Sequence, residues 1–392
     1  MTFGLTKLDA RNWGRPRAMR SVGKVAIITN MPSYYQVDLF NRFNSTSDRR
    51  LKVFYLRETT PGRQWKTSRP IDHDHEFIHE IRLPRGAYLS PGLLRSLWLF
   101  DADTVIITQY SSIAMQTVMY VSSLLRRPWV FWCERPHVEW MELPTFRSEA
   151  LGRGARRVAL GPVRKWPTEV WGIGRKAVEW YRDNSRAPVR SFPYFSDLAT
   201  LLAISRPTSG RTKPPRFLFA GKLVPRKGID LVLHSTESLI REGVSFELSI
   251  AGDGDLRPQV MELADRHPSR VKYEGFKEID EMPDLFMSAD VLLCPSRYDG
   301  WGMVVVEAMA SGMPVIATTT TGSAEEILVQ HKNGWLVPGG SQGSLQAAMR
   351  AFAGGGYDLP TMGGRAREAA TRYDISEGAQ QLDRYLSDLE NP

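Results

Sequence analysis

The chain has 392 residues, 42% of them hydrophobic and 24% charged, and a formal net charge of +8. This length gives two cores of ordinary domain size, and the two cysteines, Cys133 and Cys294, lie in apolar segments, as buried thiols in a reducing compartment do. No uninterrupted apolar run reaches the roughly 18 to 20 residues that span a bilayer, and residues 1–24 lack the apolar core of a secretion signal, so we expect a flexible basic arm there.

Apolar segments in the first half predict the central strands of a parallel sheet. Stretches of helical character separate them, and this alternation is typical of a sheet that binds ligands at the carboxyl ends of its strands. We expect a Rossmann-like domain over residues 25–195. Its strand candidates are Val25 to Asn30, Leu51 to Leu56, Thr104 to Gln109, Trp129 to Glu134 and Glu169 to Gly174.

The second half repeats the alternation after a break in composition. The polar, proline-rich run from Ser205 to Pro215 is typical of a linker, and we place the join of the domains near Pro193 to Asp197. We expect a second Rossmann-like domain over residues 196–374 and a helix over residues 375–392. The strand candidates are the stretch that begins at Arg216, then Phe246 to Gly252, Val271 to Phe276, Ala289 to Pro295, Pro314 to Thr318 and Gly334 to Pro338.

A basic loop follows the first strand of the second half. Lys222, Arg226 and Lys227 come after Gly221, between this strand and a predicted helix. Three cations on one loop suit the negative charge of a diphosphate. A run of charges is also typical of solvated surface, and the loop by itself does not decide between these interpretations.

A pair of carboxylates marks another turn, in the segment Ser296 to Thr318. Asp299 lies in the glycine turn DGWG, and Glu307 lies eight residues later, inside the predicted helix. A helix N-terminus attracts anions and hydroxyl-rich ligands, and two acceptors at different depths can bind two separate sets of hydroxyls. Glu307 stands among apolar neighbours, where burial without a partner is costly, so we favour a ligand-binding role.

The pattern D-G-x-G-x(4)-E-A-M-A-x-G-x-P-V-I-A, which begins at Asp299, resembles the E-x7-E signature of the retaining glycosyltransferases of family 4, or glycosyl transferases group 1. The resemblance implies the GT-B fold, in which an acceptor domain and a sugar-donor domain face a central cleft. It implies that Glu307 binds the ribose of a nucleotide and that Asp299, with Gly302, Met303 and Val304, binds the transferred sugar. Asp299 stands where Glu is usual and is shorter by one methylene.

The basic loop is similar to the family's G-R-L-x-x-x-K-G pattern, which binds the donor diphosphate. Lys222 and Lys227 stand at its Arg and Lys positions. The resemblance makes them catalytic as well as binding residues, because cations stabilise the departing nucleoside diphosphate. Lysine at position 222 keeps the charge but gives up the bidentate geometry of arginine. Gly221 and Arg226 complete the loop as donor-binding residues.

Weaker similarities to the family add further donor residues on the second domain. Gly252 and Asp253 follow one predicted strand and are expected to line the nucleotide cleft. Phe276 follows the next strand, where the family has a loop that packs on the nucleobase. We therefore expect Phe276 to contact the base.

The first domain offers fewer matches. Many relatives have a glycine-rich loop after the first strand, but residues 30–40 of this chain contain no glycine. Some relatives are similar in having a P-x-Y-x-x-x-L-F pattern there instead. By that resemblance Tyr34, Tyr35 and Gln36 are expected to form an acceptor platform. Glu134 stands at the mouth of a strand where many relatives carry a His near the reacting sugar, which makes it a candidate catalytic carboxylate.

The segment Arg147 to Lys165 carries six cations against one Glu. Together with nearby tryptophans it suits contact with an anionic membrane that bears a lipid-linked acceptor, and a solvated surface is the alternative that stays open. No nucleic-acid-binding motif accompanies these cations. The cluster His73 to Glu80 fits no compact zinc pattern, so we assign it to a solvated strand edge and expect no metal.

The sequence therefore predicts a glycosyltransferase that moves a hexose or related sugar, with retention, from a nucleoside diphosphate sugar to a hydroxyl of a glycan or lipid-linked acceptor. No cofactor is expected, because the nucleoside diphosphate sugar is a substrate. The setting would be bacterial surface polysaccharide or glycolipid assembly, in the cytoplasm or on the inner face of the cell membrane. A phosphorylase would need a cofactor lysine and an epimerase other carboxylates. An inactive donor-binding or lipid-binding scaffold stays open because of Lys222 and Asp299.

Overall fold

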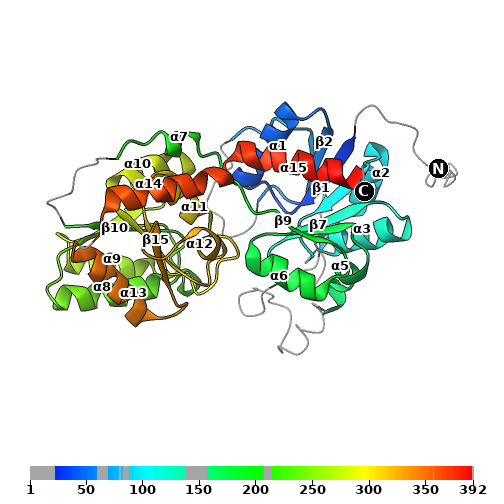
Figure 1. The fold of residues 1–392 in the computed structure, drawn as a ribbon. Coiled ribbons are helices and arrows are strands. Elements are labelled where there is room, and N and C mark those ends of the chain that lie inside the picture. The colour runs from blue at the N-terminus through cyan, green and yellow to red at the C-terminus, as the bar shows by residue number, and fades with distance from the viewer. Residues whose placement is uncertain are drawn as a thin grey trace.

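The computed structural model places the chain in two α/β domains that lie side by side (Figure 1). It describes residues 23–59, 69–78, 81–82, 88–110, 112–136, 157–206, 214–355 and 357–390. The predicted basic arm lies outside these ranges up to residue 22, and Lys24 already begins the first strand. The predicted fold class is confirmed, because each domain is built around its own parallel sheet.

The sheet of the first domain has seven described strands in the order β3-β2-β1-β6-β7-β8-β9, and all neighbours run parallel. Its strand β1 alternates between two cores, since Val25 and Ile27 pack on one face and Ala26 and Ile28 on the other. Burial on both faces explains the continuous apolar runs of the sequence. The strands are β1 (Lys24–Thr29), β2 (Arg50–Tyr55), β3 (His75–Phe77), β6 (Thr104–Ile107), β7 (Trp129–Cys133), β8 (Glu169–Gly172) and β9 (Val189–Ser191).

The edge strands β3 and β9 and the short antiparallel pair β4 (Ile81–Arg82) and β5 (Tyr88–Leu89) were not predicted from the sequence. Each edge strand has three residues, too few for a clear apolar pattern. The cluster from His73 does lie at a sheet edge, but His73 itself is buried and not solvated. Its ring nitrogens lie 3.0 Å from the Tyr55 hydroxyl and 2.7 Å from the Asn41 amide oxygen.

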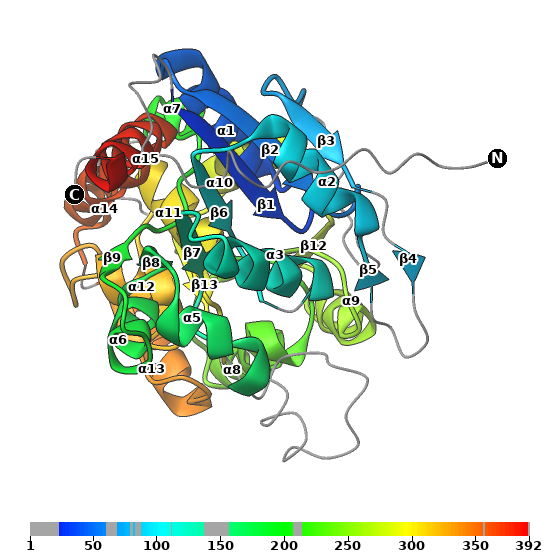
Figure 2. The ribbon, with the colours of Figure 1, turned by 90° about the vertical axis from the view of Figure 1, so that its right-hand side faces the viewer.

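Two helix layers cover the first sheet. Helices α1 (Tyr34–Thr46) and α15 (Ile375–Glu390) pack on one face. Figure 2 shows α2, α3 and α5 side by side on the other, on the side of the domain that faces away from the second domain. The remaining helices of this half are α2 (Pro91–Phe100), α3 (Ile113–Leu124), α5 (Gly161–Lys165) and α6 (Arg175–Asn184). The short helix α7 (Ala199–Leu202) packs on the second domain, against α11 (Met303–Ala310).

The sheet of the second domain has six strands in the order β12-β11-β10-β13-β14-β15, again all parallel. The order reverses direction beside β10, and parallel sheets bind ligands at such switch points. The strands are β10 (Arg216–Ala220), β11 (Glu247–Ala251), β12 (Val271–Gly275), β13 (Val291–Cys294), β14 (Val315–Thr318) and β15 (Gly334–Val337).

Helices also cover both faces of the second sheet. Side chains from α8, α9 and α13 fill one core, and side chains from α10, α11 and α14 fill the other. The helices are α8 (Ile229–Arg241), α9 (Arg257–Arg266), α10 (Met282–Ser288), α11 (Met303–Ala310), α12 (Gly322–Ile327), α13 (Gln342–Ala353) and α14 (Leu359–Ala370), with the short 3₁₀ turns η3 (Pro225–Lys227), η4 (Ile279–Glu281) and η5 (Thr371–Tyr373).

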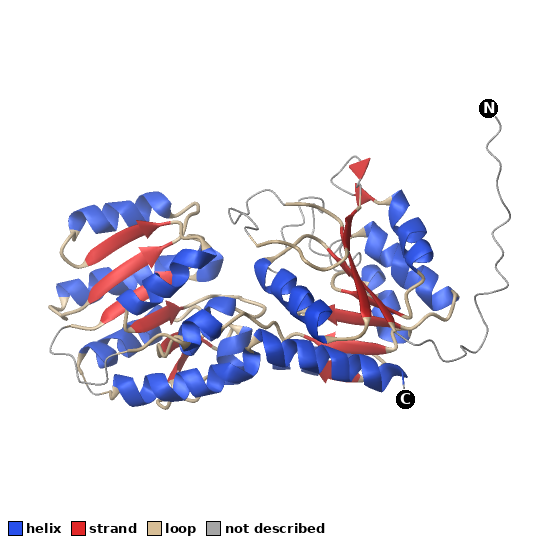
Figure 3. Cartoon of the chain, turned by 90° about the horizontal axis from the view of Figure 1, so that it is seen from above, coloured by secondary structure: helices blue, strands red, loops and turns tan. Residues whose placement is uncertain are grey.

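The chain crosses back to the first domain at its C-terminal end. Figure 3 shows α14 beside the second sheet and α15, which continues in nearly the same direction, beside the first. Arg49 holds α15 through ion pairs with Asp383, at 3.2 Å, and with Glu390. Arg190 of β9 pairs with Asp388 at 2.5 Å.

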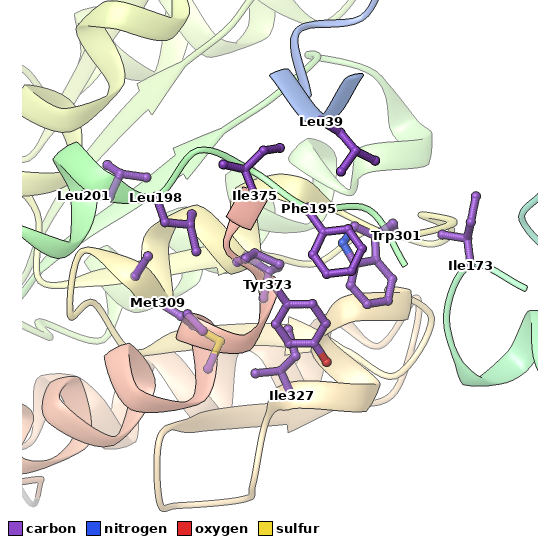
Figure 4. Close-up of a cluster of buried hydrophobic side chains, with 14 of the residues drawn as sticks. Leu39, Ile173, Phe195, Leu198, Leu201, Trp301, Met309, Ile327, Tyr373 and Ile375 are labelled. Atoms are coloured by element: carbon purple, nitrogen blue, oxygen red, sulfur yellow. The ribbon is translucent and has the colours of Figure 1, made fainter. Parts of the chain in front are cut away.

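One apolar cluster lies at the junction of the domains (Figure 4). Trp301 of the second domain packs against Tyr373, with ring centroids 5.5 Å apart, and both belong to the same core as Phe195 of the domain join and Ile375 of α15. All four are at most 3% exposed. The junction is therefore a packed core, and it fixes the positions of the two domains relative to each other.

Candidate functional site

The cationic loop between β10 and α8 lies at the carboxyl end of the second sheet. Lys227 Nζ donates to Asp299 Oδ2 at 2.5 Å, and Arg226 donates to the Tyr298 carbonyl at 3.0 Å. Gly228 allows this approach, because its φ is +74° and a Cβ there would lie 2.1 Å from the carbonyl oxygen of Pro295. The basic loop and the acidic turn are thus held against each other by the backbone.

The acidic turn leads from β13 into α11. Gly302 caps the helix with a φ of +88°, a conformation that favours glycine, and a Cβ there would lie 2.7 Å from the Thr321 methyl group. Asp299 stands before this turn and is half-buried, while Glu307, on the second turn of α11, is only 4% exposed. The two carboxylates therefore lie at different depths of one site.

Glu307 is held by two hydroxyl groups, one from the first domain and one from the join between the domains. The Tyr34 hydroxyl donates to Glu307 Oε1 at 2.9 Å, and the Ser196 hydroxyl donates to the same oxygen at 3.2 Å. Burial raises the pKa of Glu307, and the two hydrogen bonds and the charge of Arg69 oppose that shift. Both hydroxyls use Oε1, and no donor to Oε2 is found among the described residues, so Oε2 can accept from a ligand.

Glu134 brings a third carboxyl group to the site, from the end of β7 in the first domain. The two domains touch here so closely that a Cβ at Gly300 would lie 1.7 Å from Glu134 Oε2. Burial, then the charge of Asp299, raises the pKa of Glu134 to about 7, while Lys227 and Arg226 lower it. Near neutral pH this group can hold or release a proton.

These residues line one cleft of about 380 Å³ between the domains. Two further loops line it as well: Gly252 and Asp253 follow β11, and Phe276 follows β12. Gly252 approaches the basic loop so closely that a Cβ would lie 1.9 Å from the Gly221 carbonyl oxygen. The site residues predicted from the sequence that line the cleft are Tyr34, Tyr35, Glu134, Gly221, Lys222, Arg226, Lys227, Gly252, Asp253, Phe276, Asp299, Gly302, Met303, Val304 and Glu307.

Gln36 is the predicted acceptor residue that the structure does not bring to the cleft. It is buried, and its side-chain oxygen accepts from Ser33 at 2.9 Å and from Thr29 at 3.3 Å. The helical period of α1 places it on the face that packs into the core, together with Val37 and Phe40. Its role is to hold the N-terminal turn of α1, which carries the two tyrosines.

Several residues that line the cleft were not predicted from the sequence, among them Arg69, Tyr194 and Met282. Arg69 pairs with Asp38 at 2.8 Å and with Asp197 at 3.5 Å. Tyr194 packs on Tyr35 with ring centroids 4.6 Å apart. None of these three residues belongs to a sequence motif with a characteristic spacing. The one available signal was the aromatic pair in the segment that contains Tyr194, which we interpreted as a join between domains.

Other predicted features lie away from the cleft or outside the described residues. The part of the basic segment before Arg157 lies outside them. Among the described residues no group of three or more potential ligands gathers for a metal, and none of their helices is long and apolar enough to cross a membrane. Cys294 is buried, whereas Cys133 is half-buried and differs in this from the prediction.

Comparison with known proteins agrees with this geometry. Residues 203–362 match the family of glycosyl transferases group 1. An uncharacterized glycosyltransferase of Methanocaldococcus jannaschii is 36% identical over 126 residues, which are 31% of this chain and 31% of that protein. The amylovoran biosynthesis glycosyltransferase AmsK of Erwinia amylovora is 30% identical over 187 residues, 45% of this chain and 46% of that protein. The chain thus spans less than half the length of these relatives.

Solved structures resemble the whole fold. HepE of Anabaena, in complex with UDP, superimposes with a TM-score of 0.71 at 18% identity, over 94% of this chain and all of the other, 100%. At this identity the likeness concerns the fold, which is GT-B. The resemblance to the glycosyltransferase family predicted from the sequence is confirmed for the matched segment.

Proposed function

We propose that this protein transfers a sugar from a nucleoside diphosphate sugar to a hydroxyl group, because residues 203–362 match the family of glycosyl transferases group 1. The observation that carries the proposal is the convergence of a basic loop and two carboxylates on one interdomain cleft, with Glu307 Oε2 left for a ligand. A nucleoside diphosphate sugar needs these two kinds of partner, cations for its phosphates and acceptors for its hydroxyls.

The donor would lie along the loops of the second domain. Lys222, Arg226 and Lys227 would bind the diphosphate, and Glu307 would accept hydrogen bonds from the ribose hydroxyls. Asp299 would accept from the sugar. The UDP named for HepE supports a nucleotide of this kind, and Phe276 would then lie beside the base.

The transfer would proceed with retention of the anomeric configuration. The bond between the anomeric carbon and the leaving phosphate oxygen breaks, and the acceptor oxygen bonds to the same carbon on the same face. The acceptor proton passes to the departing phosphate, whose charge the cations of the basic loop stabilise. Glu134 would lie near the reacting carbon from the first domain, where its protonation state sets the local charge. No metal is needed for this chemistry.

The acceptor would be a growing glycan or a lipid-linked sugar, bound against Tyr34 and Tyr35. The biosynthetic names of the relatives, such as amylovoran biosynthesis for AmsK, support a role in surface polysaccharide or glycolipid assembly. Such assembly uses cytoplasmic nucleotide sugars, so the protein would act in the cytoplasm.

The experiment is thermal stabilisation by a panel of UDP-, GDP- and ADP-sugars, followed by an assay of nucleoside diphosphate release. A ligand that binds the native state raises the melting temperature by mass action. We expect one nucleotide class to stabilise the protein, and Glu307→Gln to weaken its binding at least about tenfold, because it removes charge-assisted hydrogen bonds. Glu247→Gln, at the exposed start of β11, is the matched control.

The same experiment separates the enzyme from an inactive scaffold. A scaffold would show stabilisation by the donor without release of nucleoside diphosphate, even when acceptor glycans are added. A folded protein that no sugar nucleotide stabilises would overturn the donor site itself.

A further inference from the structure

The large apolar side chains that are exposed to solvent gather on one face of the first domain. Nine of those in the described residues lie on or beside α2, α3 and α5: Leu94, Trp98, Leu99, Ile113, Tyr120, Leu124, Leu125, Val158 and Trp166. Leu124 is 82% exposed and Val158 68%. In the described part of the second domain only Met261, Met287 and Val329 are comparable, and they lie on different elements. Contiguous exposed apolar side chains mark an interaction surface.

The three helices form one continuous layer. Helix α2 contacts α3, and α3 contacts α5, where the rings of Tyr120 and Trp166 lie 5.6 Å apart. Figures 1 and 2 both place them on the side of the first domain that is turned away from the second domain. We call this layer, with Val158 and Trp166 at its end, the distal face. It does not include the donor cleft.

The charged residues on the helices of the distal face have one sign. The neighbouring carboxylate of Glu76, on β3, accepts a hydrogen bond from Ser96 of α2 at 2.5 Å and pairs with Lys52 at 3.0 Å. None of the helices α2, α3 and α5 contains Asp or Glu, while Arg95, Arg126, Arg157 and Lys165 are exposed on or beside them. The nearest carboxylates in sequence follow α2, and both are engaged. Asp101 pairs with Arg127 at 2.8 Å, and Asp103 accepts from the Lys24 backbone at 2.7 Å.

We propose that the distal face of α2, α3 and α5 docks on an anionic lipid bilayer. Exposed leucines can enter the boundary between headgroups and acyl chains, and tryptophan and tyrosine favour that depth because their rings are apolar with one polar group. Arginines and lysines around them would lie at the level of anionic headgroups. The charge complementarity selects a negatively charged membrane over a protein partner, which would have to present carboxylates matched to each cation.

The test uses the full chain and vesicles of phosphatidylcholine, alone or mixed with phosphatidylglycerol, in a sedimentation assay. We expect binding to the mixed vesicles, weakened by salt. The triple variant Trp98→Ser, Leu99→Ser, Leu124→Ser should bind at least about tenfold more weakly. The triple variant Arg95→Gln, Arg126→Gln, Lys165→Gln should bind roughly a hundredfold more weakly, since each cation near the surface contributes about fivefold.

Two matched triple variants on the second domain serve as controls. Met261→Ser, Met287→Ser, Val329→Ser removes exposed apolar groups, and Arg241→Gln, Lys272→Gln, Lys332→Gln removes exposed cations, both away from the distal face. Both should bind vesicles as the wild type does. Stabilisation by the donor, measured on every variant, shows that each is folded and keeps the membrane question separate from the question of transferase activity.

The proposal is overturned if the mixed vesicles do not bind the wild type, or if the control triples weaken binding as much as the distal-face triples. It is also overturned if the protein self-associates without lipid, does not bind vesicles, and becomes monomeric in the Trp98, Leu99 and Leu124 triple variant. In that case the distal face would be an interface between copies of the chain.

Discussion

The second domain shapes its side of the cleft with glycines, whereas the first domain shapes its side with larger side chains. At Gly228, Gly252 and Gly302 a Cβ would collide with a neighbouring loop, so the backbone itself fixes the geometry. The first domain instead presents Glu134 and Tyr34 from separate elements, β7 and α1. At these glycines no other residue fits unless a neighbouring loop moves, whereas side chains that line a cleft can be exchanged without moving the backbone.

This difference matches what each domain would bind. The nucleotide part of a donor is the same for many substrates and can be bound by a fixed backbone. An acceptor varies from one protein to the next, and exchangeable side chains suit it. The predictions below test whether the two sides of the cleft differ in the way that this comparison requires.

The largest effect is expected from a glycine of the second domain. Gly228→Ala would place a Cβ 2.1 Å from the Pro295 carbonyl oxygen, at a φ of +74°. Gly243→Ala is the matched control, because its φ is +77° but no atom lies within 4 Å of the added Cβ. We expect the control to cost about 1 kcal/mol of unfolding free energy and Gly228→Ala about 3 kcal/mol more, as measured by urea denaturation.

Equal losses in the two glycine variants would contradict the comparison, because backbone strain alone would then account for both. The loops at Gly228 and Pro295 would have to move apart without cost, and the backbone would not be what fixes the donor side.

A smaller effect is expected from Glu134 of the first domain. The folded protein raises its pKa from 4.5 to about 7, so the folded state binds this proton more tightly than the unfolded state does. The resulting stability is fully present below pH 4.5 and is lost as pH rises through 7. Glutamine stays neutral at every pH, so we expect Glu134→Gln to keep that stability at pH 7. Its free energy of unfolding should exceed that of the wild type by on the order of 2 kcal/mol at pH 7, and by less at pH 5.

The measurement is urea denaturation of both proteins between pH 5 and pH 8. Burial raises the pKa of Asp38 to about 6, which makes stability fall with rising pH in both proteins. This contribution cancels when the curve of the wild type is subtracted from that of the variant. Glu247→Gln, which is exposed at the start of β11, should follow the wild type. Parallel curves for Glu134→Gln and the wild type would show that the Glu134 proton is not linked to folding.

The comparison of the two domains also explains which parts of the structure could be predicted from the sequence. The basic loop and the acidic turn, which line one cleft, could be recognised because glycines and charges stand at fixed spacings within short segments, as between Gly221 and Lys227 or Asp299 and Glu307. The central strands were predicted because burial on both faces leaves continuous apolar runs. Local patterns of this kind need no knowledge of tertiary contacts.

The side of the cleft that the first domain forms could not be predicted in the same way. Arg69 and Tyr194 reach the cleft from loops that no periodic pattern marks. Gln36 packs into the core, although Tyr35, one residue earlier on α1, lines the cleft. The short edge strands β3 and β9 gave too few residues for a pattern. Such positions depend on how the domains pack, which a single sequence does not display.

The smallest effect is expected from the hydrogen bond that joins the two sides of the cleft. Tyr34→Phe removes the hydroxyl that donates to Glu307 Oε1 at 2.9 Å, while Ser196 still donates to that oxygen at 3.2 Å. We expect a loss of about 1 kcal/mol of unfolding free energy, and no weakening of donor binding, because the ribose would use Oε2. Tyr120→Phe, on the exposed face of α3, is the control.

A double-mutant cycle of Tyr34→Phe with Glu307→Gln isolates the contribution of this contact. If the two changes are additive in stability, the bond does not couple the domains and the side chains of the first domain act independently of the donor side. If Tyr34→Phe instead weakens donor binding as strongly as Glu307→Gln does, Tyr34 belongs to the donor site, and the division between a backbone-defined donor side and a side-chain-defined acceptor side fails at the residue where the two meet.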